Sequence, residues 1–97
     1  GHANFCGEKP ADMVRMLGYE YLGALHVHDN DGTGDQHLRP GLGNVDWDDF
    51  SDALAEIGFE GCMSFETSVP PAFCVGEERD GLERELARAG LKIAKKI

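Results

Sequence analysis

Two short strand-like runs, separated by a helical segment, most constrain the fold of this chain. Residues 21–28 are nearly continuously apolar until the run ends in polar residues, and residues 62–66 alternate between small or polar and large apolar side chains. Strands that alternate with helices predict an α/β fold with a parallel sheet. Because two parallel strands are not stable alone, we expect either a portion of a larger β/α fold or a chain that must associate.

Three segments carry apolar side chains at helical spacing. The first begins at Pro10, a residue that favours the first helical position, and ends at Gly18. The second covers about residues 46–57, with Asp46 as its N-cap, and the third covers about residues 77–96 after a loop over 67–75. Their predicted apolar stripes are Met13, Met16 and Leu17; Trp47, Phe50, Leu54 and Ile57; and Leu82, Leu86, Ala89 and Ile93.

Composition bounds the partners and the compartment. The chain has 9 basic and 18 acidic residues, a net charge of −9, whereas nucleic-acid binding normally requires a basic face. No apolar run approaches the ~20 residues that a membrane span needs. The cysteines are three in number (Cys6, Cys62 and Cys74) and include no C-x-x-C pair. We therefore expect a cytoplasmic protein without a disulfide framework, in which Cys62 is a small buried residue.

Histidines and acids gather between the first strand and the second helix. His26-Val27-His28-Asp29 ends the strand, and Asp35-Gln36-His37 follows within a glycine-rich loop over residues 29–45. Imidazole and carboxylate groups bind zinc, manganese or iron, and loops of this length are usually functional. From the loop alone, a metal site and a polar loop with solvated histidines both stay open.

Strand alternation brings a further carboxylate to the same region. His26 and His28 share one face of the first strand, and Glu66 lies on the equivalent face of the second, opposite the large apolar side chains. In a β/α barrel the apolar faces meet the helices and the polar faces look inward, near the carboxyl ends of the strands. A buried glutamate without a partner is costly, so Glu66 indicates a cation or a hydrogen-bonding network.

As an ordered set, these motifs resemble the sugar phosphate isomerase/epimerase superfamily, the xylose isomerase-like (β/α)8 TIM barrels that include the endonuclease IV-type apurinic-site nucleases. The resemblance covers nearly the whole chain and implies a partial barrel domain over residues 1–97: the C-terminal part, about strands 7–8 with helices 6–8. The residues that carry it are His2-Ala3-Asn4, Leu25-His26-Val27-His28-Asp29-Asn30, Asp35-Gln36-His37-Leu38-Arg39-Pro40-Gly41-Leu42-Gly43, Val45-Asp46-Trp47, Gly58-Phe59-Glu60-Gly61 and Phe65-Glu66-Thr67.

The resemblance implies a divalent metal (manganese, zinc, magnesium or cobalt) and assigns its ligands. Either His26 or His28 matches the ligand of strand seven. The His-x-x-Asp pattern ending at Asp29 favours His26, which we prefer, whereas the epimerase branch uses the second histidine of a His-x-His pair. Asp35 and His37 match the pair that holds an additional zinc in the nuclease branch.

Other residues are implied to act on the substrate. Glu66 matches a strand-eight carboxylate that binds the metal and serves as a catalytic acid or base. His2 matches the histidine of an Asp-x-x-His element, which is a metal or substrate ligand. Arg39 could bind a substrate phosphate or carboxylate, although a salt bridge explains an arginine on this loop equally well.

The implied function is a metal-dependent sugar or sugar-phosphate isomerase or epimerase, in which a proton moves next to a carbonyl through a metal-stabilised enediolate. The partner is then a small-molecule sugar, and a homo-oligomer is compatible with the incomplete sheet. Two alternatives stay open. One is a zinc-dependent apurinic-site endonuclease, which the Asp35 and His37 pair supports and the net charge of −9 opposes. The other is an inactive fragment of the barrel.

Overall fold

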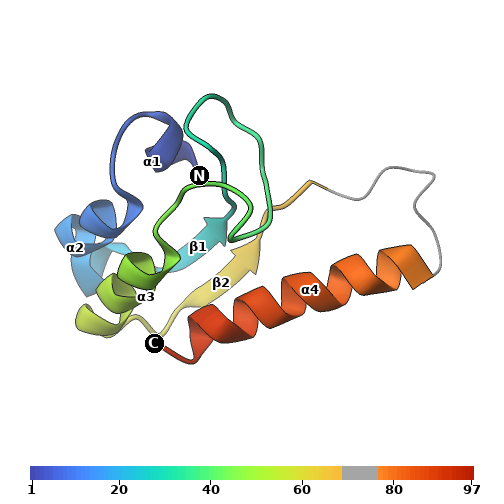
Figure 1. The fold of residues 1–97 in the computed structure, drawn as a ribbon. Helices are drawn as coiled ribbons and strands as arrows, with labels where there is room; N and C mark the ends of the chain where they lie inside the picture. The colour runs from blue at the N-terminus through green and yellow to red at the C-terminus, as the bar shows by residue number, and fades with distance from the viewer. Residues whose placement is uncertain (69–76) are drawn as a thin grey trace.

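The computed structural model describes residues 1–68 and 77–97, which form four helices and two strands (Figure 1). Both strands are shorter than the predicted runs: each ends one residue earlier, and β1 also begins later because α2 extends to Tyr21. Cys74 and most of the predicted loop over 67–75 lie outside the described residues. The elements are α1 (His2–Phe5), α2 (Pro10–Tyr21), β1 (Ala24–Val27), α3 (Trp47–Glu56), β2 (Cys62–Phe65) and α4 (Glu77–Ala94).

The two strands pair in parallel, as predicted. Their register runs from Ala24 opposite Cys62 to Val27 opposite Phe65, and the amide of Glu66 extends it by donating to the Val27 carbonyl at 2.9 Å. In Figure 1 both strands point towards α1 and the loop that joins β1 to α3. The carboxyl ends of the strands therefore face the segments that carry the predicted site residues.

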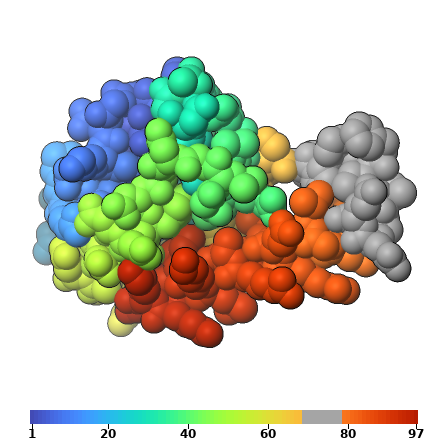
Figure 2. All heavy atoms as spheres, viewed as in Figure 1, coloured from blue at the N-terminus to red at the C-terminus, as the bar shows by residue number. Residues whose placement is uncertain are grey.

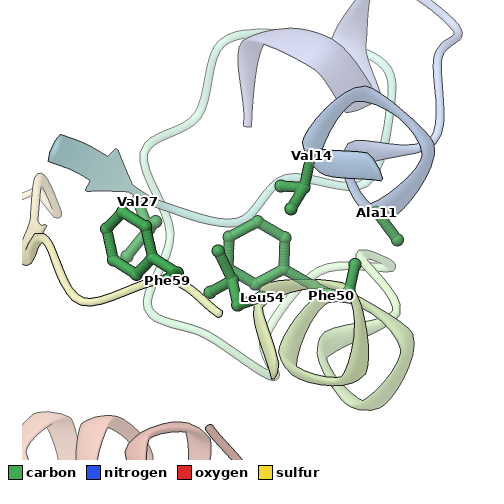
Figure 3. Packing of buried hydrophobic residues seen from close by; sticks show 7 residues of the cluster. Ala11, Val14, Val27, Phe50, Leu54 and Phe59 are labelled. Atoms are coloured by element: carbon green, nitrogen blue, oxygen red, sulfur yellow. The ribbon is translucent and has the colours of Figure 1, made fainter. Parts of the chain in front are cut away.

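The core lies between α2, α3 and the apolar face of the sheet. Val27 of β1 and Leu54 of α3 are buried there, and Leu25, Met63 and Phe65 pack against the cluster. The helix-facing, apolar side of β1 and the apolar stripe of α3 are thus as predicted. Figure 3 shows the packing of the buried cluster, which consists of Ala11, Val14, Val27, Phe50, Ala53, Leu54 and Phe59.

The start of α3 is also as predicted. The Asp46 side chain accepts a hydrogen bond from the amide of Asp49 at 3.0 Å. An aspartate in this place satisfies one of the amides that the first helical turn leaves unpaired. This cap fixes where the helix begins, and hence where Trp47 stands.

Two sequence expectations are wrong. On α2 the buried residues are Ala11 and Val14, whereas Met16 is 75% exposed; the buried face of this helix is set by its contact with α3, which local spacing does not reveal. The predicted helix end at Gly18 is confirmed in part, since Gly18 is non-helical (φ 67°) and forms a kink, after which helical residues continue to Tyr21. Cys62 is exposed because it lies on the strand face opposite the core.

Helix α4 packs on the same apolar face of the sheet, beside the first turn of α3. Gly90 is buried against the Phe65 ring, which leaves no room for a larger residue, and Lys96 pairs with Asp48 at 3.0 Å. Figure 2 shows α4, in orange and red, against the yellow-green atoms of α3. In the part of the chain that the structure describes, no helix has the length and apolar content that would let it cross a membrane.

Candidate metal centre

The loop after β1 folds back onto the carboxyl ends of both strands. Asp29 and Leu38 form an antiparallel bridge, with amide-to-carbonyl distances of 2.7 and 2.9 Å. Further along, the amide of Ser68 donates to the His37 carbonyl at 2.8 Å. These backbone bonds place His37 next to Glu66, which follows β2.

Three histidines and one aspartate converge at this end of the sheet. The two oxygens of Asp35 lie 3.1 Å from Nε2 of His2 and 3.0 Å from Nε2 of His37. The rings of His28 and His37 are stacked, with centroids 3.8 Å apart and 10° between their planes. One ligand atom from each residue lies within 4.8 Å of the others. We call His2, His28, Asp35 and His37 the His–Asp group.

His37 is oriented by its backbone and by β2. Its φ of 51° is in the left-handed region, an unusual conformation for a residue other than glycine that is enriched at functional sites. Its Nδ1 lies 2.9 Å from the Glu66 carbonyl oxygen, which can only accept, so Nδ1 carries a proton. Metal-binding histidines commonly donate the other ring nitrogen to such a carbonyl, and this leaves Nε2 facing Asp35.

The group is electrostatically coupled. The hydrogen bond to the Glu66 carbonyl, followed by that to Asp35, raises the pKa of His37. Desolvation alone would raise the pKa of Asp35, but the hydrogen bonds and charges of His2 and His37 outweigh it, and the pKa is lowered. Burial lowers the pKa of His28, and the neighbouring His37 and His2 act in the same direction. The aspartate is thus held ionised, and His28 is held neutral, the form in which imidazole binds a metal.

The residues of the His–Asp group fit a divalent cation. Nδ1 of His28 is buried and has no hydrogen-bond partner among the described residues, and such an atom requires an explanation such as an ion or a water. Three imidazoles and one carboxylate are the donor types that zinc and manganese accept. The His28 ring also packs directly against Gly1, and a side chain at position 1 would collide with Nδ1 of His28.

The other two residues predicted to bind the metal lie beside this group. Glu66 has Oε2 4.0 Å from Nε2 of His28 and 3.9 Å from Nδ1 of His37. His26 lies beyond Glu66, with Nδ1 4.0 Å from its Oε1, and its side chain is 68% exposed. Among the described residues the structure therefore groups His28, rather than the preferred His26, with the Asp35 and His37 pair.

The two predicted substrate-binding residues occupy different places. His2 lies on α1 within the His–Asp group, bonded to Asp35. The guanidinium of Arg39 instead forms an ion pair with Glu85 of α4, which is the alternative that the sequence left open. A substrate role for either residue stays a prediction.

Sequence reasoning named Asp29 and Asn30 only as parts of a motif and missed that both are buried next to His28. Asp29 and Asn30 have no exposed surface, and both are hydrogen-bonded to the surrounding loop. The sequence offers one signal: an ionisable residue and an amide directly after a buried strand require partners. Trp47 was expected to pack, and it does, but its Nε1 also donates to Asp29 at 2.8 Å.

Comparisons with known proteins identify the fold. A family model described as a xylose isomerase-like TIM barrel matches residues 1–97. A crystal structure of a D-tagatose 3-epimerase-like protein aligns with a TM-score of 0.70 and 28% identity, over 99% of this chain and 34% of that one. The described strands and helices are thus a fragment of a TIM barrel-like α/β fold.

Curated relatives match the same region of sequence. An uncharacterized protein of Methanocaldococcus jannaschii is 43% identical over 68 residues, 68% of this chain and 23% of that protein. An uncharacterized protein of Mycobacterium bovis is 33% identical over 88 residues, 88% of this chain and 30% of that protein. The chain thus spans under a third of the length of either relative. By the match along its whole length, the chain belongs to the xylose isomerase-like TIM barrel family.

Proposed function

We propose that this protein is a metal-dependent sugar or sugar-phosphate isomerase or epimerase, and that residues 1–97 are the C-terminal part of its barrel. The observation that carries the proposal is the His–Asp group with the Glu66 carboxylate 3.9 to 4.0 Å from two of its rings. The family and the epimerase-like structural neighbour support the same class of reaction.

His2, His28, Asp35 and His37 would hold the cation, and Glu66 borders it as a further ligand or as a base. A divalent cation supplies the positive charge that stabilises the oxyanion formed when a carbon next to a carbonyl loses its proton. The protein must also provide a group that takes and returns that proton.

Glu66 suits the proton-transfer role by its position. Its backbone is bound on both sides, by the amide-to-carbonyl bond with Val27 and by the His37 ring on its carbonyl oxygen. Its carboxylate is half exposed, on the strand face opposite the core. The backbone of Glu66 is therefore fixed while its carboxylate stays accessible. A general base that must reach a substrate needs both properties.

The alternative is a zinc-dependent apurinic-site endonuclease, and one observation favours it. Asp35 and His37 lie 3.0 Å apart within the His–Asp group, the pair expected of a site with more than one zinc. The net charge of −9 opposes a nucleic-acid partner because phosphate contacts require basic side chains.

Deuterium exchange tests the reaction. In deuterated water, we expect the manganese-loaded protein to replace the proton next to the carbonyl of a ketose with deuterium. NMR measures the rate of this exchange. Glu66→Gln should slow exchange by about 10²- to 10⁴-fold, the usual contribution of a general base. Glu60→Gln is the matched control, since Glu60 is exposed before β2, and it should leave the rate unchanged.

Two results would contradict the proposal. One is the absence of exchange with a panel of ketoses, aldoses and their phosphates at full metal loading. The other is cleavage of duplex DNA at an abasic site by the same preparation, which would assign the endonuclease instead.

A further inference from the structure

The Asp29 carboxylate ties the second half of the loop to the end of β1. It is 0% exposed. Oδ1 accepts from the amides of Asn30 at 2.9 Å and Val45 at 3.1 Å, and Oδ2 accepts from the Gly41 amide and from Nε1 of Trp47, both at 2.8 Å. Both oxygens are therefore occupied by N–H donors, so Asp29 is not itself available as a metal ligand.

The Asn30 side chain ties α1 to the same place. Its Nδ2 donates to the Gly1 carbonyl at 2.8 Å. Its Oδ1 accepts from Nδ2 of Asn4 at 2.8 Å and from the Gly32 amide at 3.0 Å. Gly1 is the N-cap of the short helix α1 and Asn4 lies within it, so these bonds fix the helix that carries His2.

The loop passes so close to these two residues that only glycine fits at position 43. A Cβ on Gly43 would collide with Oδ1 of Asp29 and with the Asn30 carbonyl. The bonds are therefore part of a tightly packed region, in which a displaced carboxylate cannot be accommodated without moving the loop.

We propose that Asp29 and Asn30 are positioning residues for the His–Asp group. His28 supplies one donor directly, the Asp29 carboxylate anchors the part of the loop that follows Asp35 and His37, and Asn30 holds the helix that carries His2. Three consecutive buried residues thus bring together donors that are far apart in sequence. The inference rests on the cation site of the proposed function, but not on the sugar reaction.

Cobalt binding provides the test, because Co²⁺ reports both affinity and ligand geometry through its visible spectrum. Asp29→Asn places an amide NH2 where N–H donors now point, and Asn30→Ala removes the bonds to α1. We expect each to weaken Co²⁺ binding by about 10- to 100-fold, the usual effect of groups that orient ligands, and to change the spectrum. Trp47→Phe removes a single bond to Asp29. It should therefore weaken Co²⁺ binding and change the spectrum in the same direction, but by less.

Val14→Ala is the control for lost stability alone, since Val14 is buried in the core on α2. It should lower the unfolding temperature and leave the spectrum unchanged, because distant sites act independently. If Asp29→Asn and Asn30→Ala fold and keep the wild-type Co²⁺ affinity and spectrum, the positioning role is wrong. If Asp29→Asn does not fold, an unchanged Co²⁺ spectrum in Trp47→Phe contradicts the role instead.

The inference and the reaction can fail separately. Weakened Co²⁺ binding in the two variants, without sugar turnover by the wild-type protein, supports the positioning role and contradicts the reaction. A wild-type protein that binds no divalent cation contradicts both.

Discussion

Replacing Trp47 with phenylalanine should destabilise the protein through a single lost hydrogen bond. Nε1 of Trp47 donates to Oδ2 of Asp29 at 2.8 Å, and Asp29 is completely buried, so water cannot replace the lost donor. Hydrogen bonds to charged groups contribute about 1.5–3 kcal/mol. Phenylalanine retains an aromatic ring for the edge-to-face contact with Phe50, now at 5.4 Å between centroids. We therefore expect a loss of about 1.5–3 kcal/mol in the free energy of unfolding, mostly from this bond.

Urea denaturation of a double-mutant cycle isolates that bond. The four proteins are the wild type, Trp47→Phe, Asp29→Asn and the double variant. Because the two side chains are in direct contact, their effects should be non-additive by about 1 kcal/mol or more. Effects that simply add would show that the indole stabilises only by packing and would refute the reasoning.

Two further predictions concern stability away from the site. Leu54→Ala should cost about 2–5 kcal/mol in the free energy of unfolding, because Leu54 is 0% exposed in the core and its loss leaves a cavity; a cost below about 1 kcal/mol in urea denaturation would contradict this packing. Arg15 bonds Asp49 at 2.7 Å and Glu56 at 2.7 Å, and these hydrogen bonds lower the pKa of both carboxyls from 3.8 and 4.5. Carboxyls with a lowered pKa stabilise the fold above those values, and this stabilisation is lost as pH falls through the folded pKa. Arg15→Met should therefore be less stable than wild type at pH 7, and the difference should shrink in acid. A difference in stability that does not depend on pH would count against the ion pairs.

The helices and strands could largely be predicted because their signals are local. Asp46 caps α3 three residues before the amide that it accepts from, and the apolar spacing of α3 follows the periodicity of one helix. The parallel pairing followed from strands that alternate with helices. The buried face of α2 was missed because α3 selects Ala11 and Val14, and no periodicity within α2 contains that contact.

The site was predicted less completely because it depends on contacts between distant residues. Alternation places His26 and His28 on one face, and it cannot show which of them joins Asp35 and His37. In the structure β1 ends at Val27, so His28 leaves the strand and meets the loop, whereas His26 remains on the exposed face. The role of Asp29 depends on donors as far along the chain as Trp47.

Divalent-metal binding by single-histidine variants tests the central claim most directly. Binding of Mn²⁺ or Co²⁺ would be measured by calorimetry for the wild type, His28→Ala, His37→Ala and His26→Ala. Groups that orient a metal ligand typically change metal affinity by about 10- to 100-fold, and removing a ligand itself should lower the affinity at least as much. We expect affinity to fall by about 100-fold or more in His28→Ala and His37→Ala, and to stay nearly wild-type in His26→Ala. Undiminished affinity in His28→Ala and His37→Ala would contradict a cation site built from the His–Asp group.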